Sequence, residues 1–133
     1  MNGPSEACHL LRMARKDLQA MRALSDPQIA DVETFGFHAE QAVEKALKAW
    51  LDLRGVLYPR IHDLDELLRL LGQHGAAVPE EFAALTILTD FGVAFRYEAY
   101  DDPEEPFDRL EVLKQVERLL LHVEALVPRE SQD

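Results

Sequence analysis

Four alanines on one stretch of the chain constrain the fold more than any other feature. They are Ala39, Ala42, Ala46 and Ala49. At 3.6 residues per turn, these positions fall on one side of a helix and form a shallow seam that another helix can approach closely. Bulky apolar residues lie beside this alanine seam, namely Val43, Leu47, Trp50 and Leu51. The segment from Phe37 to Leu51 is therefore predicted to be a helix with a buried face.

Two rows of polar residues run along the same predicted helix. The first row repeats every four residues and is predicted to be a solvated face; it consists of Glu40, Glu44, Lys48 and Asp52. The second row lies against the alanine seam and consists of His38, Gln41 and Lys45. Amphipathicity does not explain this second row. Three interpretations are open: a polar network buried between helices, a contact between subunits, or part of an anion pocket.

Helical periodicity dominates the rest of the chain, and strand alternation is nearly absent. We therefore predict an all-α protein, an up-and-down bundle of four main helices plus one short helix. The predicted helices span about 5–24, 27–55, 64–72, 79–97 and 107–127, with Gly55 and Gly72 as helix ends. The last helix is predicted to bury Leu110, Leu113, Val116, Leu120, Val123 and Leu126. We therefore predict one domain over residues 5–127, followed by a frayed tail at residues 128–133.

Composition restricts the function and the compartment. The 133 residues include 14 basic and 25 acidic ones, a formal net charge of −11. This charge repels polyanions at long range and argues against broad RNA or DNA binding, whereas a basic partner is attracted. The single cysteine, Cys8, cannot form an intramolecular disulfide, and no signal peptide or membrane-spanning run of about 18 apolar residues is present. We expect a cytoplasmic protein that does not enter a membrane.

His62 and Asp63 are residue types that bind metals, but their surroundings favour a structural role. No second cluster supplies the three or four ligands that a metal site requires. The dipeptide lies where a helix starting at Leu64 needs a cap. We therefore predict a helix cap at His62 and Asp63, and we expect neither a metal nor another cofactor.

Arg96, Tyr97 and Tyr100 lie at the end of the fourth predicted helix, just before an acidic turn. An arginine at this place can stabilise the carbonyl groups of the helix end, or it can bind an anion. Both roles are open from the residues alone.

Four segments carry a combination of residues that is typical of one family. They are residues 14–20, residues 37–49, residues 62–68 and the pair Arg96-Tyr97. In this combination the chain resembles the HEPN family, the higher-eukaryote and prokaryote nucleotide-binding domain, over about residues 5–127. The resemblance implies a helical bundle, usually a homodimer, often encoded beside a small nucleotidyltransferase as a toxin–antitoxin-like pair.

The resemblance also implies an activity that this sequence only partly supports. Many family members look like metal-independent ribonucleases, in which an arginine is followed by a histidine after four to six intervening residues. The arginine stabilises phosphate charge and the histidine transfers a proton. Here Arg96 matches the arginine, but none of residues 98–104 is a histidine. Tyr100 cannot replace it, because an unperturbed tyrosine has a pKa of about 10.

Two functions follow from the resemblance. The preferred one is a non-catalytic module that binds a nucleotide or a nucleotidyltransferase partner. Its expected binding residues are Arg96, Tyr97, Tyr100, His38, Gln41 and Lys45. The alternative is a divergent ribonuclease that combines Arg96 with a histidine from elsewhere, His38 or His62.

Overall fold

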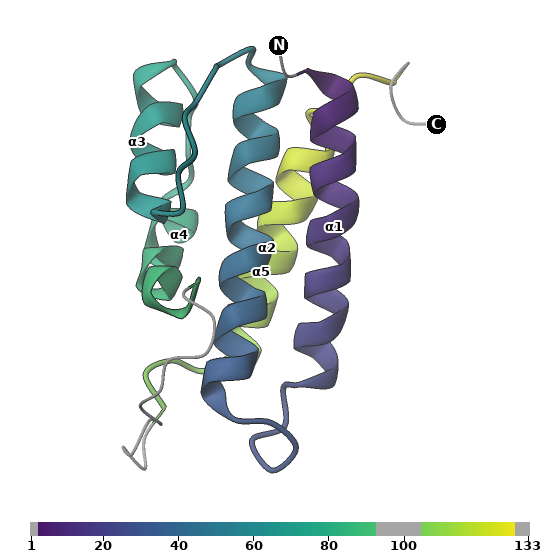
Figure 1. The fold of residues 1–133 in the computed structure, drawn as a ribbon, viewed down its shortest axis with the longest axis vertical. Coiled ribbons are helices and arrows are strands. Elements are labelled where there is room, and N and C mark those ends of the chain that lie inside the picture. Colours follow the sequence, from purple (N-terminus) through teal and green to yellow (C-terminus); the bar gives the residue numbers. More distant parts are fainter. Residues whose placement is uncertain (1–2, 93–104, 130–133) are drawn as a thin grey trace.

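The described part of the protein is a bundle of helices packed around one central helix. The computed structural model describes residues 3–92 and 105–129, and it contains no strand in these ranges. Three long helices lie side by side (Figure 1): α1 (Pro4–Ala23), α2 (Val32–Leu53) and α5 (Arg109–Glu124). A column of short elements lies beside α2, away from α1: α3 (Leu64–Gln73), α4 (Glu80–Ala83) and the 3₁₀ helix η1 (Ala84–Gly92). Of these, α3 and η1 pack against α2, whereas α4 contacts η1 and α5. The prediction of an all-α bundle is confirmed.

The alanine seam of α2 is buried, as predicted. All four of its alanines are inaccessible to solvent. The most extensive helix contact in the described residues is that of α1 with α2, and Ala7 and Ala14 of α1 are fully buried as well. Small side chains on both helices allow their backbones to approach closely. None of the helices in the described ranges has the length and hydropathy that a membrane crossing needs.

Several helix ends differ from the prediction. Helix α2 begins at Val32 rather than at Pro27, because the Asp31 carboxylate caps it by accepting a hydrogen bond from the Thr34 N–H at 2.8 Å. Gly55 ends α2 with a φ of 70°, as its predicted role requires. Helix α3 continues through Gly72, and Gly75, with a φ of 85°, provides the left-handed residue after its end.

The fourth predicted helix is mostly 3₁₀ where the structure describes it. Helix α4 has a single turn, and the chain continues as η1 up to Gly92; residues 93–97 lie outside the described ranges. The buried residues Phe82, Leu85 and Leu88 recur every third position. This spacing matches the three residues per turn of a 3₁₀ helix, whereas an α-helix would rotate them apart.

The buried face of α5 also differs from the prediction. Leu110 and Leu126 are 59% and 46% exposed, although both were expected inside. The buried apolar residues of the helix are Val112, Val116, Leu119, Leu120 and Val123. Leucines occur all around α5, so apolar periodicity alone does not select which stripe faces the core.

Candidate functional site

The polar row of α2 that was predicted to be solvated is buried. Glu40, Glu44 and Asp52 are 0%, 6% and 2% exposed, and the Lys48 side chain is largely covered. The prediction was wrong because η1, α3 and the loop before α3 pack on this side of α2 (Figure 1). A buried carboxylate is costly unless it is paired or neutralised, so a row of them marks a candidate functional site.

Glu44 contacts a lysine and a histidine side chain. Its Oε2 accepts a hydrogen bond from Lys48 Nζ at 3.0 Å and lies 3.2 Å from His62 Nδ1. Lys48 comes from the next turn of α2, whereas His62 reaches Glu44 from the loop before α3. One carboxylate therefore links the central helix to the short elements.

Glu40 lies one turn from Glu44 and has a different environment. Its Oε1 accepts a hydrogen bond from Gln41 Nε2 at 2.9 Å. Burial, and then the negative charge of Glu44, raise the pKa of Glu40 to about 8. Glu40 Oε2 and Glu44 Oε1 are both buried without a protein donor in the described residues. A proton on Glu40 satisfies both oxygens, because the protonated carboxyl donates a hydrogen bond to Glu44.

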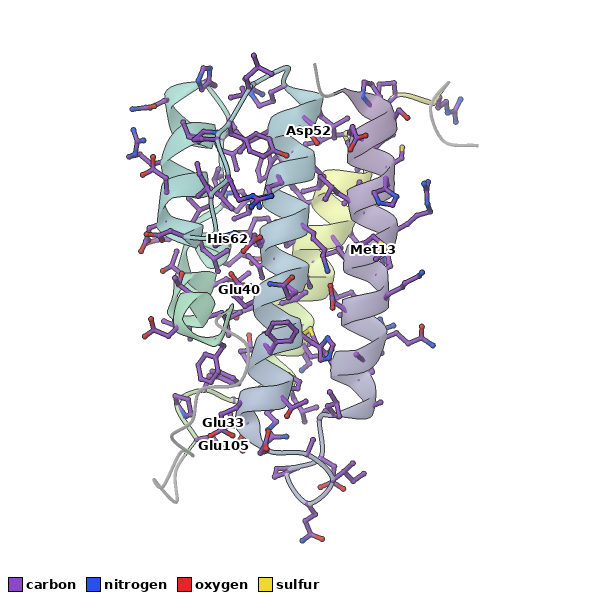
Figure 2. All side chains as sticks on the ribbon, in the orientation of Figure 1. Met13, Glu33, Glu40, Asp52, His62 and Glu105 are labelled. Atoms are coloured by element: carbon purple, nitrogen blue, oxygen red, sulfur yellow. The ribbon has the colours of Figure 1, made fainter. Side chains whose placement is uncertain are left out.

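Asp52 lies further along the same row and affects a tyrosine. Burial, and then the negative charge of Asp52, raise the pKa of the Tyr58 hydroxyl. Tyr58 belongs to the loop before α3, so this loop meets the acidic row at Asp52 as well as at Glu44. Figure 2 shows Glu40 and His62 between α2 and the column of short elements, with Asp52 nearer the C-terminal end of α2.

A pocket of about 440 Å³ opens beside Glu44. Its volume lies within the range of roughly 300 to 1,000 Å³ that is common for small-ligand sites. Three parts of the chain line it: α2, the residues just before α3, and η1. The lining residues are Gln41, Glu44, His62, Asp63, Thr89, Asp90 and Gly92. Three of them are carboxylates, so we call this cavity the acidic pocket.

Two glycines allow η1 to lie directly on α2 at the acidic pocket. A Cβ atom at Gly92 would lie 2.5 Å from Cδ of Glu40, and a Cβ atom at Gly36 would lie 2.5 Å from Cδ1 of Phe91. Both distances are shorter than van der Waals contact permits. The absence of these two side chains therefore fixes how closely the end of η1 can approach the buried Glu40 carboxyl.

The second polar row of α2 divides between two places. His38 Nδ1 lies 3.0 Å from Asp17 Oδ1, and Lys45 Nζ donates to Asp17 Oδ2 at 2.5 Å. Asp17 belongs to α1 and is buried, so these three residues form a polar network between α1 and α2. Gln41 is not part of this network. It donates to Glu40 instead and lines the acidic pocket.

The remaining predicted site residues have separate positions. Asp63 stands at the N-cap of α3, where its carboxylate accepts a hydrogen bond from the Asp65 N–H at 3.0 Å, while His62 contacts Glu44. Arg96, Tyr97 and Tyr100 lie outside the described residues. In the ranges that the structure describes, no group of three or more metal-ligating side chains could hold a metal ion.

Sequence reasoning missed Glu40 and Glu44 as site residues, and it missed Thr89 and Asp90 altogether. One signal was available for the two glutamates. Like charges four residues apart repel each other on an exposed helix, so an acidic pair at this spacing indicates that something other than solvent stabilises it. Thr89 and Asp90 gave no such signal, because their role depends on the fold of η1.

Comparisons with known proteins agree with the architecture. The family model of the HEPN domain matches residues 7–126. The chain therefore belongs to the HEPN domain family. Among solved structures, the crystal structure of an archaeal HEPN homologue is similar, with a TM-score of 0.65 and 21% sequence identity, covering 96% of this chain and 100% of the other. At this identity the similarity shows the fold alone. A comparison with curated protein sequences found no match.

Proposed function

We propose that this chain is a non-catalytic HEPN module that binds a small nucleotidyltransferase in a toxin–antitoxin-like pair, and that it binds this protein partner rather than a free nucleotide. The observation that carries the proposal is the acidic pocket between α2 and η1. Its carboxylates, in a chain of net charge −11, attract a basic partner surface and repel a free phosphate group.

The lysine and histidine side chains near the pocket support binding to a protein rather than phosphate chemistry. Lys48 and His62 both contact Glu44, and Lys45 is paired with Asp17. Among the described residues at this site, each of these three side chains already has a carboxylate partner. Arg96 follows Gly92 by four positions in the sequence. We include Arg96, Tyr97 and Tyr100 in the proposed contact surface, together with Gln41.

The test is co-expression with the nucleotidyltransferase that we expect to be encoded beside this gene, followed by co-purification and calorimetry. Asp90→Lys reverses one charge at the acidic pocket and should weaken binding by about tenfold or more. Asp65→Lys makes the same charge change on the exposed surface of α3 outside the pocket, and it should leave the affinity within about twofold. Absence of any complex, or equal losses in both variants, would refute the proposal.

One observation favours a divergent metal-independent ribonuclease as the second candidate. His38 and His62 each present Nδ1 to a buried carboxylate, that of Asp17 or Glu44. A carboxylate at Nδ1 orients a histidine for proton transfer through its other nitrogen. RNA cleavage in the presence of EDTA that is lost in Arg96→Ala and in one of the two histidine-to-alanine variants would replace the non-catalytic proposal.

A further inference from the structure

Three buried oxygen atoms at the acidic pocket lack a hydrogen-bond donor in the described part of the chain. They are Glu40 Oε2, Glu44 Oε1 and Thr89 Oγ1. Glu44, which is more than nine-tenths buried, and Thr89 both line the pocket, and Glu40 lies against Gly92 of the lining. Buried acceptors without donors are energetically costly. In the free protein a proton on Glu40 satisfies the two carboxylate oxygens, so a ligand suits this site if it donates several hydrogen bonds in place of that proton.

The chemistry of the lining narrows the class of ligand. A phosphate or carboxylate ligand would bring further acceptors and negative charge to Glu44, Asp63 and Asp90. Among the described residues no three metal-ligating side chains converge, so the pocket does not offer a metal ion a complete set of ligands. A guanidinium group remains well matched, since it carries a permanent positive charge and donates five hydrogen bonds from a planar fork that fits carboxylates.

We propose that the acidic pocket binds a guanidinium group, in practice an arginine side chain of a protein partner, and that this binding displaces the proton shared by Glu40 and Glu44. The identity of the partner rests on the proposed function, whereas the chemistry of the pocket does not. On binding, the proton shared by Glu40 and Glu44 leaves to solvent. The N–H groups of the guanidinium then donate hydrogen bonds to the two carboxylates in its place.

The charges around the pair determine the direction of this exchange. Three elements place polar or charged side chains around Glu40 and Glu44. These side chains are Gln41 and Lys48 of α2, His62 and Asp63 before α3, and Thr89 and Asp90 of η1. An added cation stabilises the ionised form of Glu40 and lowers its pKa from about 8. At neutral pH the complex then holds fewer protons than the free protein. Binding therefore releases up to one proton and strengthens as the pH rises toward 8.

Two small probes test the inference on the full chain. N-acetyl-arginine methylamide carries the guanidinium group, and N-acetyl-citrulline methylamide has nearly the same shape without the charge. In an NMR titration, the arginine probe should shift the amide signals of Thr89 and Gly92 with a Kd on the order of 1 mM, and the citrulline probe should not. The Kd should fall as the pH rises from about 6 to about 8, by at most about tenfold per pH unit for one proton.

Two variants separate binding from proton release. Glu40→Gln keeps a permanent donor to Glu44, so the Kd of the arginine probe should depend less on pH in this variant than in the wild type over the same range. Glu44→Gln removes the carboxylate that lines the pocket and should abolish binding. Spectra of both free variants establish that they are folded before the titration begins.

Several results would overturn the inference. Equal binding of both probes would show that the pocket does not recognise the charge of the guanidinium group. A Kd of the wild type that does not change with pH would show that binding releases no proton. Absence of any shift of the Thr89 and Gly92 signals with the arginine probe would show that the pocket does not bind a guanidinium group. The proposed function is tested separately. If the chain binds the arginine probe but no nucleotidyltransferase, the proposed function is wrong and the guanidinium site stands.

Discussion

At the scale of single residues, Glu40 couples the stability of the protein to pH. Its pKa is raised from 4.5 to about 8 in the folded state, so between these values the folded chain holds a proton that the unfolded chain has lost. The stabilisation is complete below the unfolded value and disappears as the pH rises through about 8. For one proton the free energy of unfolding changes by at most about 1.4 kcal/mol per pH unit.

We predict that Glu40→Gln removes this dependence. Glutamine donates to Glu44 at every pH, so urea denaturation should show the wild type losing stability relative to the variant as the pH rises from about 5 to about 8. The surface carboxylates contribute equally to the pH dependence of the free energy of unfolding in both proteins, so the difference between the two proteins reports Glu40 alone. Parallel stability profiles would mean that Glu40 is ionised throughout this range.

A second prediction at this scale concerns Gly92 and uses Gly72 as its control. Gly92→Ala forces a methyl group against the Glu40 carboxyl and should lower the free energy of unfolding by about 1–3 kcal/mol. Gly72 lies inside α3 with open space around it, so Gly72→Ala should instead stabilise the protein by about 0.5–1 kcal/mol. Thermal and urea unfolding measure both. A neutral Gly92→Ala variant would show that η1 is not held closely on α2.

At the scale of elements, the contact of α1 with α2 contains one buried carboxylate. Asp17→Ala leaves Lys45 without its partner between the two helices, and we expect a loss of about 2 kcal/mol, less than for a fully buried pair because the Lys45 and His38 side chains are partly exposed. Glu117→Ala breaks an exposed ion pair between α5 and Arg22 of α1 and should cost less than about 0.5 kcal/mol. Equal losses in the two variants would show that burial of Asp17 has no special effect.

The elements also show what the sequence could and could not reveal. The alanine seam predicted the central helix correctly, because small residues at helical spacing have no better explanation than close packing. The acidic row of α2 was misread, because the pattern of one helix does not report what covers its polar side. Burial of Glu40 and Glu44 depends on η1, whose threefold apolar spacing was read as part of an α-helix. The acidic pocket was therefore beyond a reading of individual helices.

At the scale of the whole molecule, net charge and exposed leucines act in opposite directions on self-association. Each chain has a net charge of −11, so two copies repel each other at low ionic strength. Leu110 and Leu121 of α5 are eleven residues apart, which places them three turns apart on the same face, and both are more than half exposed. A helix face with two exposed leucines can contribute to contact with a second copy.

We therefore predict a homodimer whose stability increases with salt. Sedimentation velocity at micromolar concentration should show a larger dimer fraction at about 500 mM than at about 50 mM NaCl, because salt screens the repulsion between the two chains. Leu121→Glu should reduce the dimer fraction, whereas Leu57→Glu changes an even more exposed leucine in the loop before α3 and should not. A monomer at both salt concentrations would contradict the homodimer, and equal effects of the two substitutions would exclude α5 as its interface.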